Sequence, residues 1–179
     1  MTVQQAFENF IFSRQILGCT DKTIKTYQEL CKPFIEFMGA NKDISALNKD
    51  LYNKYIKTLY DRPITQSTRA SYTRHFKAFV HWIEEEYGLD LDYQIIKVPK
   101  TPKKVLHIYT DDEIRQIFQM VKADEEWIVA RNQCIIALML DCGLRQNEVC
   151  SLQRIEVNLH TRTLKVNGKG NKERIVSFG

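Results

Sequence analysis

The chain lacks any run of apolar residues approaching the roughly 20 that a membrane-spanning helix needs, so no transmembrane helix is expected. Its first ten residues, MTVQQAFENF, lack the basic start and apolar stretch of a secretory signal peptide. We therefore expect a cytoplasmic protein without a membrane partner. The net charge of +4 in 179 residues is too small to identify a partner by itself.

Paired cysteines are also missing. The five cysteines are an odd number and none forms a CxxC pair, so neither a zinc ribbon nor a disulfide framework is predicted. In a cytoplasm these thiols stay reduced. Cys134 and Cys142 are expected to pack as small apolar residues. No metal site is predicted.

Positive charge is concentrated in two short segments. Residues 97–104 contain four lysines and no acid, and residues 162–174 contain five basic residues against the single acid Glu173. Local clusters of this kind suit a polyanionic partner better than the total charge does.

Helical periodicity dominates residues 1–88 and predicts helices over 3–17, 20–38, 45–60 and 65–87. Thr20 is a suitable N-cap and Gly39 a suitable end for the second segment, and Pro33 inside it allows a kink near Cys31.

The fourth segment has two different faces. Its apolar stripe contains Tyr72, Phe76, Phe79, Val80 and Ile83. The opposite face is small, hydroxylic or basic, and suits either hydrogen bonds to phosphates or simple solvation. That face contains Ser67, Ala70, Ser71, Arg74, Lys77 and His81.

A positively charged, extended linker is predicted over residues 89–106, which include the segment PKTPKK. Helical pattern then resumes with a capping box between Thr110 and Glu113. The segment 127–140 is apolar all round, which predicts burial at the centre of a domain. Gly143 ends it, and residues 145–152 resemble one or two further helical turns.

The period changes in the last part of the chain. Strands are predicted over 163–166 and 174–178, with a third short strand near 155–159. Asn167 and Gly168 favour a tight hairpin turn with basic residues at its tip. The last strand would be an exposed edge, so we expect the chain to be a piece of a longer protein.

Two residues are candidates for chemistry. Arg145 follows the apolar helix directly, and its planar fork of donors suits phosphate oxygens. An ion pair with Glu148 at i,i+3 is the alternative interpretation. Lys169 lies between two glycines in NGKGNK, where it could reach a ligand and donate a proton, or simply be a solvated turn lysine.

Together these features resemble a known family. The segment DCGLRQNEVCSLQRIEVNLHTRTLKVNGKGNKERIV is similar to the tyrosine recombinases, which include phage, transposon and Xer-type integrases. Residues 19–39 and 65–86 resemble the two hallmark helices of that family's core-binding domain. The resemblance implies a mainly α fold. A helical core-binding domain at 1–88 and a basic linker at 89–106 precede the start of an α+β catalytic domain at 107–179.

The resemblance also implies a mechanism. These enzymes cut one DNA strand with a tyrosine, form a 3′-phosphotyrosyl link and rejoin the end to another strand, without a metal or cofactor. By the match, Arg145 would stabilise charge on the scissile phosphate and Lys169 would protonate the departing 5′ oxygen. Glu148 matches a residue that supports the helix of this arginine.

The chain departs from the family in what it lacks. No HxxR motif is present, because His160 is followed by TRT, and no tyrosine follows Tyr109. Only two of about six active-site parts are present, so this chain alone is expected not to cleave DNA. Smaller departures are Cys142, Glu156 and Ser177, where the family usually has Thr, Asp and Pro.

Double-stranded DNA is the partner that the resemblance implies, and many phosphate contacts would make binding fall steeply with salt. In the family the two domains clamp the duplex and full-length proteins assemble as tetramers on DNA, whereas this piece is expected to be monomeric off DNA. The expected DNA contacts are Thr23, Lys25, Thr26, Ser67, Arg69, Ser71, Arg74, Lys77, Lys100, Lys103, Lys104, Lys172 and Arg174.

Two alternatives to the recombinase interpretation stay open. A naturally truncated, non-catalytic DNA-binding protein would occupy a recombination site and block or shape it. A helical protein-interaction domain would show no salt-sensitive binding to DNA.

Overall fold

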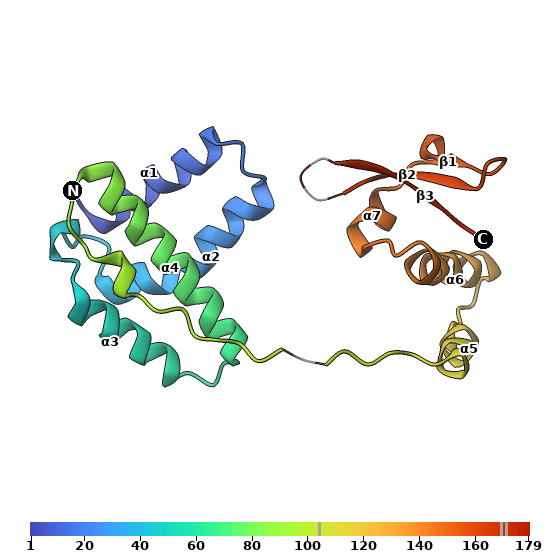
Figure 1. The fold of residues 1–179 in the computed structure, drawn as a ribbon, viewed down its shortest axis with the longest axis horizontal. Helices are drawn as coiled ribbons and strands as arrows, with labels where there is room; N and C mark the ends of the chain where they lie inside the picture. The colour runs from blue at the N-terminus through green and yellow to red at the C-terminus, as the bar shows by residue number, and fades with distance from the viewer. Residues whose placement is uncertain (104, 169, 171) are drawn as a thin grey trace. The chain divides into compact units, whose positions relative to one another are not determined.

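The computed structural model describes residues 1–103, 105–168, 170 and 172–179. It divides into two compact units, Met1–Lys104 and Val105–Gly179 (Figure 1). Each unit has its own hydrophobic core.

The first unit is helical. Its main helices are α1 (Val3–Ile16), α2 (Asp21–Met38), α3 (Lys49–Tyr60) and α4 (Gln66–Tyr87). Side chains of Thr2, Thr20, Asn48 and Thr65 cap these helices by accepting a hydrogen bond from the third helical N–H. The helices predicted over 3–17, 20–38 and 65–87 are confirmed, and α2 continues through Pro33.

The predicted start of the third helix was wrong. Residues Ile44–Ala46 form a separate 3₁₀ turn, η1, and α3 begins only at Lys49. The reason is local, because Asp43 caps the turn and Asn48 caps the helix within five residues of each other. Each cap satisfies a backbone N–H that a continuous helix would have used within its own ladder.

Aromatic rings fill the core of the first unit. Phe34 lies 4.3 Å from Phe76 and 5.1 Å from Tyr55 between ring centroids, which joins α2, α3 and α4. Phe10 on α1 contacts Phe79 at 5.4 Å. α4 therefore packs against the other three helices (Figure 1).

The prediction that Ala70 lies on the polar face of α4 was wrong. Its side chain is buried, as are those of Thr73 and Phe76. The buried stripe is wider than the apolar pattern indicated, because α4 is covered on several sides.

The segment expected to be a linker, 89–106, is divided in the structure. Its first part packs on α4 through the 3₁₀ turn η2 (Tyr93–Ile95), with Leu91 and Ile96 buried. The Glu84 carboxylate accepts the N–H of Leu91 at 2.9 Å, and Tyr52 donates its hydroxyl to the Leu91 carbonyl at 3.1 Å. Residues 97–103 have no regular secondary structure.

The second unit combines helices with a small sheet. Its helices are α5 (Asp111–Met120), α6 (Glu126–Asp141) and α7 (Gln146–Ser151). A 3₁₀ turn, η3 (Arg154–Glu156), leads into strands β1 (Val157–Asn158), β2 (Thr163–Asn167) and β3 (Glu173–Ser177). The sheet is antiparallel in the order β1-β2-β3, with Leu164 opposite Val176. The predicted fold class, mainly α with a small antiparallel sheet, is confirmed.

The β2–β3 hairpin is wider than the predicted Asn-Gly turn. Asn167 still pairs with Glu173, and the Gly168 N–H donates to the Lys172 carbonyl at 2.8 Å. Gly170, with φ of 78°, provides a left-handed backbone within this loop. Residues 168–172 connect the paired strands, and of these Lys169 and Asn171 are outside the described residues.

The predicted central burial of the apolar helix was also wrong. Among the described residues, α6 has no buried side chain, and Trp127 is 60% exposed. The small core of this unit is formed instead by Leu144, Leu164 and Val166. The apolar composition of α6 favours burial of the whole helix, but the described residues cover only part of the α6 surface.

The two cysteines of this region differ. Cys142 is half-buried against the small core, as expected, whereas Cys134 is exposed on α6, so its predicted packing was wrong. Within the part of the chain that the structure describes, no helix is long and apolar enough to cross a membrane.

Candidate functional site

Arg145 lies where the chain turns between α6 and α7. Gly143 has a φ of 61°, which reverses the chain after α6, and the next residue, Leu144, is buried. Arg145 itself is the N-cap residue of α7, with extended backbone. The backbone of Arg145 is therefore held between the buried Leu144 and α7, while the Arg145 side chain is 69% exposed.

Glu148 fixes this arginine from within the short helix. Its carboxylate is buried and accepts the Arg145 N–H at 2.8 Å and one Arg145 Nη at 3.0 Å. The ion pair considered as an alternative for Arg145 is therefore present. It uses one terminal nitrogen, and the described residues offer the rest of the guanidinium no other hydrogen-bond partner.

The same carboxylate also binds Arg174 on β3. The two Nη atoms of Arg174 lie 2.8 and 2.9 Å from the two oxygens of Glu148, which is a bidentate ion pair. Hydrogen bonds from Arg174 and from the Arg145 backbone lower the pKa of Glu148 far below its ordinary value, and the pair raises the pKa of Arg174. Glu148 thus joins α7 to the hairpin.

The hairpin approaches this pair closely at Gly168. A Cβ atom there would lie 3.1 Å from Nη1 of Arg174 and 3.2 Å from the Lys172 carbonyl oxygen. A side chain at this position would therefore crowd the Arg174 guanidinium and the backbone of the hairpin. Lys169, the second candidate for chemistry, lies outside the described residues, and Lys172 is exposed.

Sequence reasoning did not find the pairing of Glu148 with Arg174, although a signal for it exists. Side chains alternate along β3, so Arg174 shares a face with Val176, which packs on the small core. An arginine on the inner face of a strand needs a carboxylate partner, because an unpaired charge there is costly.

The expected DNA contacts on α2 are on its first two turns. The hydroxyl groups of Thr23 and Thr26 contact their own helix, at 3.0 Å from Thr20 Oγ1 and 2.8 Å from the Lys22 carbonyl oxygen. Lys25 is largely exposed, 3.9 Å from Glu29.

The corresponding residues of α4 lie beside the same helix pair. Tyr27 and His75 contact edge to face at 5.2 Å, which joins the turn of α2 carrying Thr26 to the turn of α4 carrying Ser71 and Arg74. Arg74 and Ser67 are exposed and Ser71 is half-buried. The structure thus brings part of the predicted set together on one helix pair.

Two other predicted contacts have intramolecular partners. Arg69 donates to the carbonyls of Leu59 at 3.0 Å and Arg62 at 3.1 Å, at the end of α3. Lys77 donates to the Ile96 carbonyl at 3.0 Å. Lys100 and Lys103 are exposed in the irregular segment, and Lys104 lies outside the described residues.

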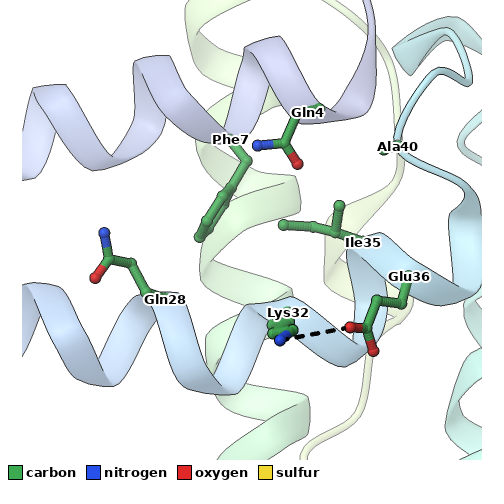
Figure 2. Close-up of a pocket in the computed structure, with 7 residues that line it drawn as sticks. All are labelled: Gln4, Phe7, Gln28, Lys32, Ile35, Glu36 and Ala40. Carbon is green, nitrogen blue, oxygen red and sulfur yellow. Dashed lines mark ion pairs between the residues drawn. The ribbon is translucent and has the colours of Figure 1, made fainter.

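None of these residues lines the hollow between α1 and α2, which has a volume of about 430 Å³. Phe7 and Ile35 line its apolar part, and the ion pair of Lys32 with Glu36, at 3.8 Å, lies at its edge (Figure 2). Across the described residues, no cluster of three or more His, Cys, Asp or Glu side chains could hold a metal ion.

Comparison with known proteins agrees with the resemblance of the motifs. Residues 108–179 match the model of the phage integrase family. The tyrosine recombinase XerC of Bacillus pumilus is 28% identical over 163 residues, which are 88% of this chain and 52% of that protein. XerC of Staphylococcus carnosus is 27% identical over 96% of this chain and 59% of its own length. The chain thus spans about half the length of the curated relatives it matches.

Solved structures share the fold. A lambda integrase tetramer bound to a Holliday junction has a TM-score of 0.79 at 12% identity, over 99% of this chain and 51% of that one. The Tn1549 transposon integrase in complex with circular intermediate DNA has a TM-score of 0.69 at 16% identity, over 100% of this chain and 61% of that one. The family model and the XerC relatives thus identify residues 108–179 as part of a domain of the phage integrase family, and the chain is similar to tyrosine recombinases over most of its length.

Proposed function

We propose that this chain is the DNA-binding part of a site-specific recombinase that cuts and rejoins DNA in the cytoplasm through a 3′-phosphotyrosyl intermediate. The observation that carries this proposal is the exposed guanidinium of Arg145, which a buried carboxylate orients at the end of α6. An oriented, permanently charged donor of this kind suits a phosphate whose charge grows during strand transfer. The similarity to recombinases supports the same interpretation.

The chain would bind DNA without cleaving it. No tyrosine follows Tyr109 within these 179 residues, and the HxxR motif is absent from them. Arg145 would hold the scissile phosphate, and Lys169 would protonate the departing 5′ oxygen in the whole protein. The reaction would use no metal or cofactor, because the phosphotyrosyl bond conserves the energy of the phosphodiester.

DNA would contact the two helices that Tyr27 and His75 join, and the basic segments. Lys25 and Arg74 are the exposed basic residues that this helix pair offers to phosphates. Arg69 and Lys77 would first have to leave their carbonyl partners. The other proposed contacts are Thr23, Thr26, Ser67, Ser71, Lys100, Lys103, Lys104 and Lys172.

The proposed partners are duplex DNA and further recombinase protomers bound to it, with this chain monomeric in the absence of DNA. A gel shift with duplex DNA at two salt concentrations tests the binding: the affinity should fall steeply as salt increases. A suicide substrate should yield no covalent adduct with this chain. Binding that is absent or insensitive to salt would contradict the DNA-binding role.

The role of Arg145 is tested in a protein that also carries the nucleophile. There Arg145→Ala should lower cleavage by roughly 10²–10³ and weaken binding to the site by no more than about tenfold, because one oriented phosphate donor is lost. Joint loss of binding and folding would instead indicate a structural role.

A naturally truncated DNA-binding protein is the second candidate function. The coding sequence after codon 179 separates the two: an HxxR motif and a tyrosine would support the recombinase, and a stop codon the truncated protein.

A further inference from the structure

One buried carboxylate serves two arginines at the candidate site. Glu148 accepts four hydrogen bonds, two from Arg145 and two from Arg174, which uses up the acceptor positions of its two oxygens. The two arginines differ in what remains available. Both Nη atoms of Arg174 bind Glu148, whereas Arg145 uses only one and is 69% exposed.

The charges of the three residues explain why the second arginine matters. With both arginines present, two positive charges and one negative charge leave the cluster at +1. Without Arg174, the Arg145–Glu148 pair would be neutral. Glu148 would then have unoccupied acceptor positions, and an arginine beside such a carboxylate favours a bidentate pair. Arg145 would be drawn toward Glu148 and away from solvent.

The hairpin is shaped to keep Arg174 in this place. Alternation along β3 directs its side chain to the inner face of the sheet, and Gly168 leaves the space that its guanidinium needs. A phosphate could take a bidentate contact between the two terminal nitrogens of Arg174 only by displacing Glu148, which would leave a buried carboxylate with fewer partners.

We propose that Arg174 is a positioning residue: it neutralises Glu148 and thereby keeps the guanidinium of Arg145 available to phosphate oxygens. This positioning role takes the place of the DNA contact that the sequence predicted for Arg174. The inference rests on the proposed function, because it assumes that Arg145 binds phosphate.

A double-mutant cycle on DNA binding tests the proposal. The affinity of this chain for a short fluorescently labelled duplex of arbitrary sequence is measured by anisotropy at low salt. Arg174→Met should weaken binding by about tenfold, the worth of a charge-assisted hydrogen bond. Glu148→Gln alone should change binding by less than about twofold, and the double variant should return to within about twofold of the unmodified chain.

Arg145→Ala is the second arm of the experiment. In an Arg145→Ala background, Arg174→Met should have no further effect beyond about twofold, because the group it protects is gone. If Arg145→Ala does not weaken binding in the unmodified chain, the phosphate-binding role of Arg145 is wrong. If it does, but Glu148→Gln fails to relieve Arg174→Met, only the positioning role is overturned and Arg174 is itself a DNA contact.

A matched control lies on the same hairpin. Lys165 and Glu173 form an exposed ion pair at 2.9 Å. Lys165→Met and Glu173→Gln remove the same charges from β2 and β3 without touching Arg145, so their effects on DNA binding should add. Coupling as strong as in the Glu148 cycle would mean that general charge causes both results, and would overturn the proposal.

Folding is followed in parallel by circular dichroism and thermal unfolding. If Arg174→Met unfolds the second unit, Arg174→Lys replaces it, because lysine retains the positive charge beside Glu148 but loses the fork. Binding within about threefold of the unmodified chain is then expected for Arg174→Lys. A folded Arg174→Lys variant that binds as weakly as Arg145→Ala would contradict charge neutralisation by Arg174.

Discussion

The hydroxyl of Tyr55 is buried in the core of the first unit and has no hydrogen-bond partner among the described residues. Burial also raises the pKa of this phenol. The neighbouring Tyr52 is equally enclosed, but donates to the Leu91 carbonyl. The two tyrosines therefore make a matched pair that differs in hydrogen bonding.

Replacing Tyr55 with Phe should leave the free energy of unfolding unchanged or raise it by about 1 kcal/mol, because the hydroxyl is desolvated without compensation. Tyr52→Phe should lower it by about 1 kcal/mol, because the Leu91 carbonyl loses its donor. Urea unfolding of both variants measures the difference. Equal destabilisation by the two substitutions would contradict this account of Tyr55.

Residue-scale prediction from sequence succeeded where chemistry is local. The ion pair of Arg145 with Glu148 joins residues only three apart, and it was recognisable in the segment GLRQNE. Arg174 lies 26 residues from Glu148, and its partner emerges only when the hairpin folds back onto α7. The alternation of β3 indicates that Arg174 needs a carboxylate partner, but the spacing does not identify that partner as Glu148.

At the scale of elements, α3 and α4 show that an arginine predicted to bind DNA can instead donate hydrogen bonds to carbonyls at the end of a neighbouring helix. Arg69 donates to two carbonyls at the end of α3, and its guanidinium lies 5.1 Å from the centre of the Tyr60 ring. Five residues on, Arg74 is exposed with no hydrogen-bond partner among the described side chains.

The two arginines should therefore respond in opposite ways. Arg69→Met should destabilise the first unit by about 1–3 kcal/mol, because two charge-assisted hydrogen bonds are lost. Arg74→Met should leave stability unchanged and lower the salt slope of DNA binding by about 1. Thermal unfolding and anisotropy titrations test both. A large loss of stability from Arg74→Met would show that it supports the fold.

Element boundaries were predictable where a capping side chain marks them, as Thr20 and Thr65 do. They were missed where two caps lie close together, as around α3. The burial of α6 was mispredicted. An apolar pattern shows that a helix favours burial, but it does not show whether other residues cover that helix, and the described residues leave α6 without a buried side chain.

At the scale of the whole molecule, the two units have very different cores. More than twenty buried apolar residues fill the first, whereas Leu144, Leu164 and Val166 are the buried core of the second. Hydrophobic stabilisation grows with buried apolar area, so the second unit should unfold at lower urea concentration.

Limited proteolysis tests this difference together with the irregular segment 97–103. Trypsin should cut first at the exposed Lys100 or Lys103 and then degrade the second unit, leaving a resistant fragment that contains α1 to α4. A resistant fragment from the second unit would contradict the expected order of stability.

Acid should act on the second unit through Glu148. Because the pKa of this carboxyl is lowered in the folded state, the unfolded chain binds its proton first as pH falls. The stabilisation is therefore complete above the unfolded pKa of about 4.3 and is lost progressively below it. When the pH is lowered from neutral to acidic, the urea midpoint of the second unit should fall less in the Glu148→Gln variant than in the unmodified chain. Equal acid sensitivity of both proteins would count against the ion pair.

The chain has two tryptophans, and the structure assigns one to each unit. Trp82 is enclosed in the core of α1 to α4, whereas Trp127 is 60% exposed on α6. An enclosed indole emits at shorter wavelength than a solvated one, so the fluorescence spectrum contains two separable signals. Substituting Trp82 by Phe would leave an emission that reports on α6 alone. A blue shift of that emission would reveal any molecule that covers the apolar surface of the helix.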